Sequence, residues 1–217
     1  MAFRSRSVLV AAMLALAAAA PLQAQRGIEV NALYGYYRPT GEFDPSGTVA
    51  SGLPVRPQDL GGVALGGEAR LWLGPRWGVQ VQGTTTTSTT PDVVTPGGCC
   101  LGAPVRVSTF AARAAYNLLP DSRDARLWLG AGPALVRHGG KGYADFGSPV
   151  YLAGSAGAGV SVRLPGSGVR VSAGSAALLY HYMVYSPVDW GLPTRETVQS
   201  GWRRDLLLHV GLGWGLP

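Results

Sequence analysis

The chain has 217 residues and a formal net charge of +6, and only 14% of its residues are charged. Ordinary soluble proteins carry about 25% charged residues, and this chain has a single lysine, Lys141, so it lacks the side chains that normally cover a soluble surface. Its arginines are scattered along the sequence rather than clustered, so the positive charge does not predict nucleic-acid binding. No segment after residue 24 is apolar over the roughly 18 residues that a transmembrane helix needs, so we expect no membrane-spanning helix in that part of the chain.

The N-terminal residues have the pattern of a targeting segment. Arg4 and Arg6 precede an apolar run over residues 8–20, and a small-residue cleavage site that ends at Ala24 follows. The run is shorter than the ~20 residues of a comfortable transmembrane helix. We therefore predict a cleaved secretory signal peptide over residues 1–24 and a single mature domain over residues 25–217, the alternative being an uncleaved anchor.

The last sixteen residues alternate between two kinds of side chain, with Arg204 and Leu207 as exceptions. A period of two indicates a strand with chemically different faces. Even positions carry mostly large apolar residues, and odd positions are mostly small or polar: on one face Trp202, Arg204, Leu206, Leu208, Val210, Leu212, Trp214 and Leu216, on the other Arg203, Asp205, Leu207, His209, Gly211, Gly213 and Gly215. About ten residues of this pattern, with aromatic residues near both ends, are what a membrane-spanning β-strand needs.

Seven further segments show alternation or strand-like composition. The eight predicted strands cover residues 27–38, 60–74, 76–87, 104–119, 125–138, 149–164, 168–185 and 202–217. The seventh loses its alternation between Ala176 and Tyr182, where a bulge could shift its phase, so the sequence leaves the phase of this strand open.

The connections alternate between short and long. The short ones are turn-rich segments at residues 74–76, 119–124 and 165–167. The long ones cover residues 39–59, 88–103, 139–148 and 186–200. This order predicts an all-β fold: an eight-stranded antiparallel up-and-down transmembrane β-barrel with short periplasmic turns, long outer loops and both termini in the periplasm.

Aromatic residues are predicted to form two girdles at the membrane interfaces. The predicted periplasmic girdle contains Trp72, Trp77, Tyr116, Trp128 and Trp214, and the outer girdle contains Tyr34, Tyr36, Tyr37, Tyr180, Tyr182 and Tyr185. The alternative is that these residues form the core of a soluble, lipocalin-like barrel with its apolar face inward.

The signal peptide, the eight strands, the alternating connections and the C-terminal strand resemble the small eight-stranded outer-membrane barrels of the OmpA, OmpX and OmpW type. The chain end also resembles the signal that the barrel-assembly machinery reads, a polar residue followed by glycine and two apolar positions, here His209, Gly211, Trp214 and Leu216. The family commonly ends in Phe, whereas this chain ends in Leu216 and Pro217.

Charged side chains on the predicted inward faces are candidates for ion pairs in the lumen. They are Glu29, Glu68, Arg70, Arg113, Arg163, Arg170, Arg203 and Asp205. A barrel of eight strands is just wide enough for side chains to fill it, and an isolated charge there is costly. We therefore expect a salt-bridged plug, the alternative being a narrow gated pore whose excess arginine favours anions.

The sequence shows no catalytic or metal-binding pattern, so we predict that the protein is not an enzyme and uses no metal or cofactor. The lipid A deacylases of the resembling family use a His and a Ser two residues apart, but His138, His181 and His209 are followed two positions later by Gly140, Met183 and Gly211. In the second long loop, Cys99 and Cys100 are adjacent and could form a vicinal disulfide, with either a redox or adhesion role or no specific role.

The sequence thus predicts an integral outer-membrane protein with a structural barrel, whose interaction or membrane-integrity role lies in the outer loops. The alternatives are a narrow solute or ion channel and, less favoured, a lipid-modifying enzyme. The expected partners are outer-membrane lipids and, during insertion, the barrel-assembly machinery, while the sequence identifies no extracellular partner.

Overall fold

The computed structural model describes residues 27–40, 61–89, 93–95, 98–100, 104–120, 122, 124–140, 150–185 and 197–216. The predicted signal peptide, residues 1–24, lies outside the described residues. No helix among the described residues is long and apolar enough to cross a membrane.

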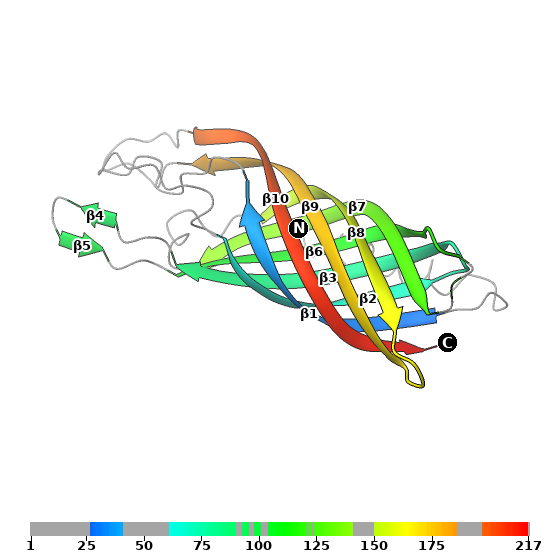
Figure 1. Ribbon diagram of the computed structural model, residues 1–217. Helices are drawn as coiled ribbons and strands as arrows, with labels where there is room; N and C mark the ends of the chain where they lie inside the picture. Colours follow the sequence, from blue (N-terminus) through cyan, green and yellow to red (C-terminus); the bar gives the residue numbers. More distant parts are fainter. Residues whose placement is uncertain are drawn as a thin grey trace, which may run out of the picture.

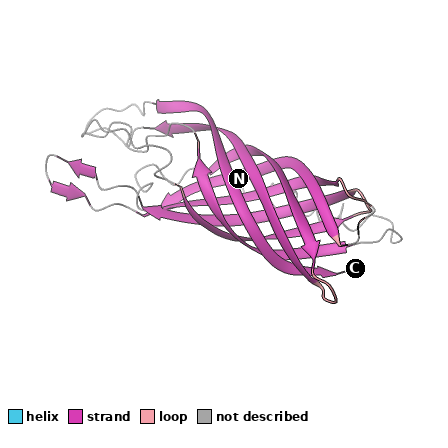
Figure 2. Cartoon of the chain, in the orientation of Figure 1, coloured by secondary structure: helices cyan, strands magenta, loops and turns pink. Residues whose placement is uncertain are grey.

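Eight strands form one closed antiparallel barrel (Figures 1 and 2). They are β1 (Gly27–Pro39), β2 (Gly62–Trp72), β3 (Trp77–Thr89), β6 (Pro104–Asn117), β7 (Ala125–Gly140), β8 (Val150–Arg163), β9 (Val169–Tyr185) and β10 (Thr197–Leu216). Their order around the barrel is β1-β10-β9-β8-β7-β6-β3-β2, so every strand pairs with its sequence neighbour in the barrel and the last pairs with the first. The predicted fold class is confirmed.

Pairing of β1 with β10 closes the barrel. The register runs from Ile28 opposite Leu216 to Pro39 opposite Asp205. An open sheet would leave a row of backbone N–H and C=O groups unpaired, and such groups cannot be left exposed to lipid. The alternating C-terminal strand is therefore the element that removes both sheet edges.

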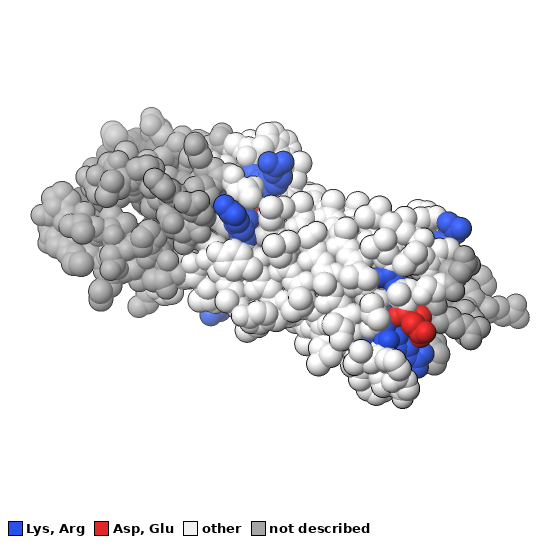
Figure 3. Space-filling model, viewed as in Figure 1, with Lys and Arg blue, Asp and Glu red and all other residues white. Residues whose placement is uncertain are grey.

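The barrel is apolar outside and polar inside. On β10 the even residues from Trp202 to Trp214 are exposed, whereas Arg203, Asp205 and His209 are buried. The same alternation holds on β1, where Val30 is exposed and Glu29 is buried. In the view of Figure 3, charged side chains lie near the two ends of the barrel and an uncharged wall separates them.

The seventh predicted strand, β9, has no bulge between Ala176 and Tyr182. Strand β9 keeps one register with β10 from Val169 to Val184, and its even residues, from Arg170 to Tyr182, face the lumen throughout. The sequence of β9 alternates only weakly because the polarity of the side chains that line the lumen changes along the strand. Near the short turns the lumen is polar, whereas toward the outer end it is apolar, so both faces of β9 carry apolar residues there.

That apolar part of the lumen is a continuous cluster of buried side chains. It contains Tyr37, Ala64, Val105, Val107, Ala111, Ala134, Val136, Tyr151, Ala153, Ala176, Leu178, Tyr180, Tyr182 and Leu207. A second, smaller cluster near the short turns contains Trp72, Ala115 and Trp128. Side chains therefore fill the lumen at both ends.

The predicted aromatic girdles are only partly correct. Trp77, Trp214, Tyr34 and Tyr36 are exposed on the outer wall and Tyr116 is half-buried, but Trp72, Trp128, Tyr37, Tyr180 and Tyr182 are buried in the lumen, and the side chain of Tyr185 lies outside the described residues. Each buried aromatic residue lies on the inward phase of its strand. Position along the barrel alone thus did not decide whether an aromatic residue met lipid.

A small hairpin lies within the predicted loop 88–103. Strands β4 (Val93–Thr95) and β5 (Gly98–Cys100) pair with Val94 opposite Cys99. Cys99 and Cys100 are thus part of a paired strand in their backbone, while their side chains lie outside the described residues.

Close strand packing predicts a glycine-specific cost on β10. A Cβ atom added at Gly213 would clash with the backbone oxygen of Val30, whereas one added at Gly83 would meet nothing closer than 3.9 Å. We expect Gly213→Ala to lower the free energy of unfolding by about 1–3 kcal/mol, measured by urea denaturation of protein folded in phospholipid vesicles. Gly83→Ala is the control and should change it by less than about 0.5 kcal/mol. Equal effects of the two substitutions would contradict this packing.

Candidate functional site in the barrel lumen

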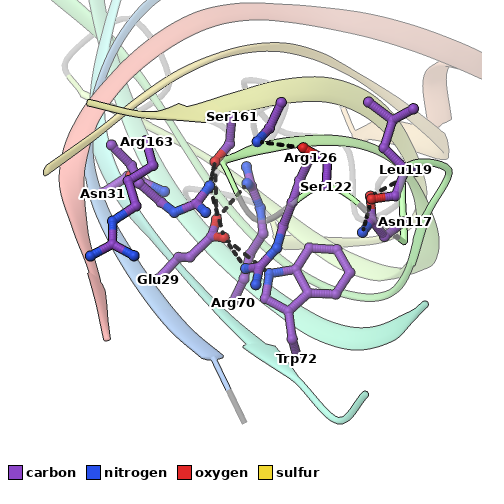
Figure 4. A network of polar contacts seen from close by, with 12 residues as sticks. Glu29, Asn31, Arg70, Trp72, Asn117, Leu119, Ser122, Arg126, Ser161 and Arg163 are labelled. Carbon is purple, nitrogen blue, oxygen red and sulfur yellow. Dashed lines mark hydrogen bonds and ion pairs between the residues drawn. The ribbon is translucent and has the colours of Figure 1, made fainter. Parts of the chain in front are cut away.

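Glu29 is the centre of an ion-pair network in the lumen (Figure 4). The inward phase of β1 buries its carboxylate, which pairs with arginines from three other strands. Arg70 Nη1 lies 3.2 Å from Oε2, Arg170 Nη1 lies 3.5 Å from Oε1, and Arg126 also pairs with Oε1. One acidic group thus offsets the charge of several arginines.

Neutral groups complete the surroundings of Glu29. Trp72 Nε1 donates a hydrogen bond to Oε1 at 3.2 Å, and Ser161 Oγ donates one to Oε2 at 3.4 Å. The guanidinium of Arg70 stacks over the ring of Trp128 at 4.4 Å, and that of Arg126 stacks over Trp72 at 5.0 Å. The tryptophans close this end of the lumen and stabilise the arginines by cation–π contact.

Glu68 on β2 is connected to the Glu29 network through Arg70. Its carboxylate accepts hydrogen bonds from Arg70 and Gln80 and from Asn31 Nδ2, the last at 3.0 Å. Arg70 therefore bridges Glu29 and Glu68 and joins two acidic groups of neighbouring strands.

Arg113 lies beyond Glu68 and has a different set of partners. Its Nε donates to Ser155 Oγ at 2.7 Å, and its Nη1 donates to the side-chain oxygens of Gln82 at 2.8 Å and Gln80 at 3.4 Å. All of these hydrogen-bond partners are neutral, so Arg113 is the described lumen arginine whose charge is least directly compensated.

Asp205 organises a second polar cluster within the apolar outer half of the lumen. It accepts hydrogen bonds from the hydroxyl groups of Tyr37 and Tyr180, the latter at 2.6 Å, and from Arg203 Nε at 2.9 Å. The Tyr180 hydroxyl also lies 3.1 Å from Nε2 of His138. The predicted candidates Arg203 and Asp205 thus form a cluster separate from that of Glu29.

The candidate assembly signal lies along the end of β10. His209 and Gly211 are buried on the lumen side, and Trp214 is exposed on the outer wall. The backbone of Leu216 pairs with Ile28, and its side chain lies outside the described residues. The structure thus divides these residues between the two faces of the strand.

One predicted lumen residue is not in the lumen. Arg163 is exposed, and its Nε donates a hydrogen bond to the backbone oxygen of Ser167 at 2.7 Å in the β8–β9 turn. The alternation along β8 predicts that Arg163 points inward. It is the last residue of that strand, however, so its side chain lies at the mouth of the barrel, where water solvates the charge in place of an ion-pair partner.

Arg126 and the neutral partners were missed as site residues. Arg126 lies two positions before Trp128, on the inward face of β7. This alternation was the sequence signal that could have placed Arg126 in the lumen. Gln80, Ser161 and Tyr37 share that signal on their own strands, but uncharged residues on an inward face do not by themselves indicate which carboxylate they contact.

The described residues contain no group of three His, Cys, Asp or Glu side chains that could hold a metal ion.

A closed eight-stranded antiparallel barrel with an apolar wall and a polar interior is the fold of the small outer-membrane barrels. Solved structures agree: the outer membrane protein OprG from Pseudomonas aeruginosa matches with a TM-score of 0.57 and 10% identity, over 88% of this chain and 95% of that chain. Neisserial surface protein A (NspA) matches with a TM-score of 0.50 and 13% identity, over 87% and 96%. No protein-family model and no curated protein sequence matches the chain.

The Glu29 network predicts a large stability loss when its central charge is removed. Glu29→Gln leaves buried arginines without their shared carboxylate and should lower the free energy of unfolding by about 3–5 kcal/mol, measured in vesicles. Arg163→Gln, at the exposed mouth, should change it by less than about 0.5 kcal/mol. The double variant with Arg126→Gln should lose less than the sum of the two single variants; strict additivity would contradict the pairing.

Proposed function

We propose that this protein is an integral outer-membrane protein whose barrel is a closed, non-enzymatic scaffold and whose outer loops carry an interaction or membrane-integrity role. The observation that carries the proposal is the burial of the lumen. Residues that line a water-filled passage are accessible to water, whereas Glu29, Arg70, Trp128, Tyr37 and Tyr180 are each at most 1% exposed.

Two layers in series support the closed scaffold. Near the short turns, the Glu29 network and its two tryptophans fill the cross-section. Toward the outer end, the apolar cluster and the Asp205 group fill it again. A solute would have to displace ion pairs in one layer and packed aromatic side chains in the other.

The role of the loops is inferred from the topology. The four long connections join strands at the barrel end opposite the short turns, where outer-membrane barrels present their variable loops. With a closed lumen, we infer that the interaction role lies in these connections. For insertion, we propose that the exposed Trp214 and the end of β10 are recognised by the barrel-assembly machinery after secretion through the signal peptide.

A second candidate function is a narrow anion channel. The basic residues of the described lumen, Arg70, Arg113, Arg126, Arg170 and Arg203, outnumber Glu29, Glu68 and Asp205. The neutral partners of Arg113 would let it exchange an anion more readily than a paired arginine would. This reading requires both layers to open.

Conductance in planar bilayers separates the scaffold from the channel. We expect the folded wild-type protein to give no discrete openings at moderate voltage, with a known open porin as the positive control. Repeated openings of defined size with anion preference would contradict the closed scaffold and support the channel.

The lipid-facing wall predicts a depth-dependent cost for a charged residue. Leu208 is exposed on β10 between Arg204 and Trp214, whereas Leu118 is exposed next to a short turn. We expect Leu208→Arg to destabilise the protein in vesicles by about 2–4 kcal/mol and Leu118→Arg by about 0–1 kcal/mol. Equal costs at the two positions would argue against a membrane-embedded wall.

A further inference from the structure

Four arginines face outward at the outer ends of their strands. They are Arg38 on β1, Arg204 on β10, Arg106 on β6 and Arg137 on β7, and all four are exposed. They differ from the lumen arginines because they lie on the same face of the barrel as the apolar wall. Their charge is therefore presented outward, beside the long connections.

These arginines form two pairs across neighbouring strands. Arg38 is opposite Leu206, two residues from Arg204, and Arg137 is opposite Ser108, two residues from Arg106. Diagonal neighbours on one face of a sheet lie within reach of long side chains. We call the first pair, Arg38 and Arg204, the seam pair, and the second, Arg106 and Arg137, the opposite pair.

The two pairs lie on opposite sides of the barrel. The seam pair spans the β1–β10 junction and the opposite pair spans the β6–β7 junction, with two strands separating them in either direction around the barrel. The same arrangement of charge thus occurs twice, and each pair forms a separate local site.

Neither pair has an acidic partner within the described part of the chain. The described acidic residue of the outer half, Asp205, is buried and held by Arg203, Tyr37 and Tyr180. Two positive charges on the same face of adjacent strands repel one another. An anion held between them would remove that repulsion.

Apolar surface continues from each pair toward the middle of the wall. Tyr36 and Leu208 are exposed below the seam pair, and Phe110 and Leu135 are exposed below the opposite pair. A ligand that fits this surface has an anionic headgroup and apolar chains.

The aromatic residue beside Arg204 indicates the level of the membrane interface. Trp202, two residues from Arg204 on the outward face, is 72% exposed, and its ring meets that of His181 edge-on at 5.6 Å. Exposed tryptophan is typical of the membrane–water interface. The seam pair therefore lies at the depth of lipid headgroups.

We propose that the seam pair and the opposite pair each bind a phosphate group of a lipid headgroup in the outer leaflet. The guanidinium group suits this role because its forked donors match two phosphate oxygens at once. The inference rests on the proposed function, since it requires the barrel wall to be in a membrane.

The test measures binding of a phosphorylated glycolipid to the full chain folded in detergent micelles. The probe is diphosphorylated lipid A, compared by calorimetric titration with the same lipid after removal of its phosphates. We expect the phosphorylated form to bind more tightly, and its affinity to fall about tenfold in each double variant, Arg38→Gln with Arg204→Gln and Arg106→Gln with Arg137→Gln. Arg163→Gln, an exposed arginine at the other end of the barrel, should bind like the wild type.

Three outcomes would overturn the inference. The first is equal affinity for the two lipids, and the second is a loss of affinity in Arg163→Gln equal to that in the double variants. The third is displacement of the lipid by inorganic phosphate at the same phosphate concentration, which would indicate a site for the free ion. Heat-modifiable migration on unboiled gels reports whether each variant has folded as a barrel. A folded barrel without phosphate preference rejects the lipid site alone, whereas failure of the wild type to fold in detergent or to insert in vesicles rejects the proposed function. Replacing each arginine by lysine should retain part of the preference, because the charge remains and the forked geometry is lost.

Discussion

The carboxylate of Glu29 connects more of the barrel than any other described side chain in the lumen. It lies on β1, the strand that closes the sheet against β10, and it contacts Arg70 on β2, Arg126 on β7, Ser161 on β8 and Arg170 on β9. A charge in so narrow an interior is tolerated only when it is paired and hydrogen-bonded. The strands that meet at Glu29 are therefore held in one arrangement by the need to satisfy a single acidic group.

The rest of the lumen follows from this constraint. Arginines that surround Glu29 need flat, polarisable neighbours, and Trp72 and Trp128 supply them while they fill the space near the short turns. The outer half needs fewer charges because apolar side chains fill it, and its remaining charged pair, Arg203 and Asp205, is completed by tyrosine hydroxyl groups. The polar and apolar halves together support the proposed role of the barrel as a scaffold.

Arginine has two different roles in this chain, and the phase of the strand decides which one applies. Arg70 and Arg203 point into the lumen and neutralise buried carboxylates. Arg38 and Arg204 point outward at the rim, where the described chain offers no acidic partner. An arginine that points inward therefore helps to fill the lumen, whereas an arginine that points outward is a candidate for binding a lipid headgroup.

The sequence by itself determined the fold, since a period of two, alternating connections and a closing C-terminal strand are local patterns that a barrel must satisfy. It also identified which faces were inward, and it placed Glu29, Arg70 and Asp205 in the lumen. Only the tertiary structure decided which of these groups meet, because partners such as Glu29 and Arg126 lie on strands that are not neighbours in the sheet. It also decided that Arg163 lies at the mouth, because that outcome depends on depth along the barrel, which alternation along one strand does not encode.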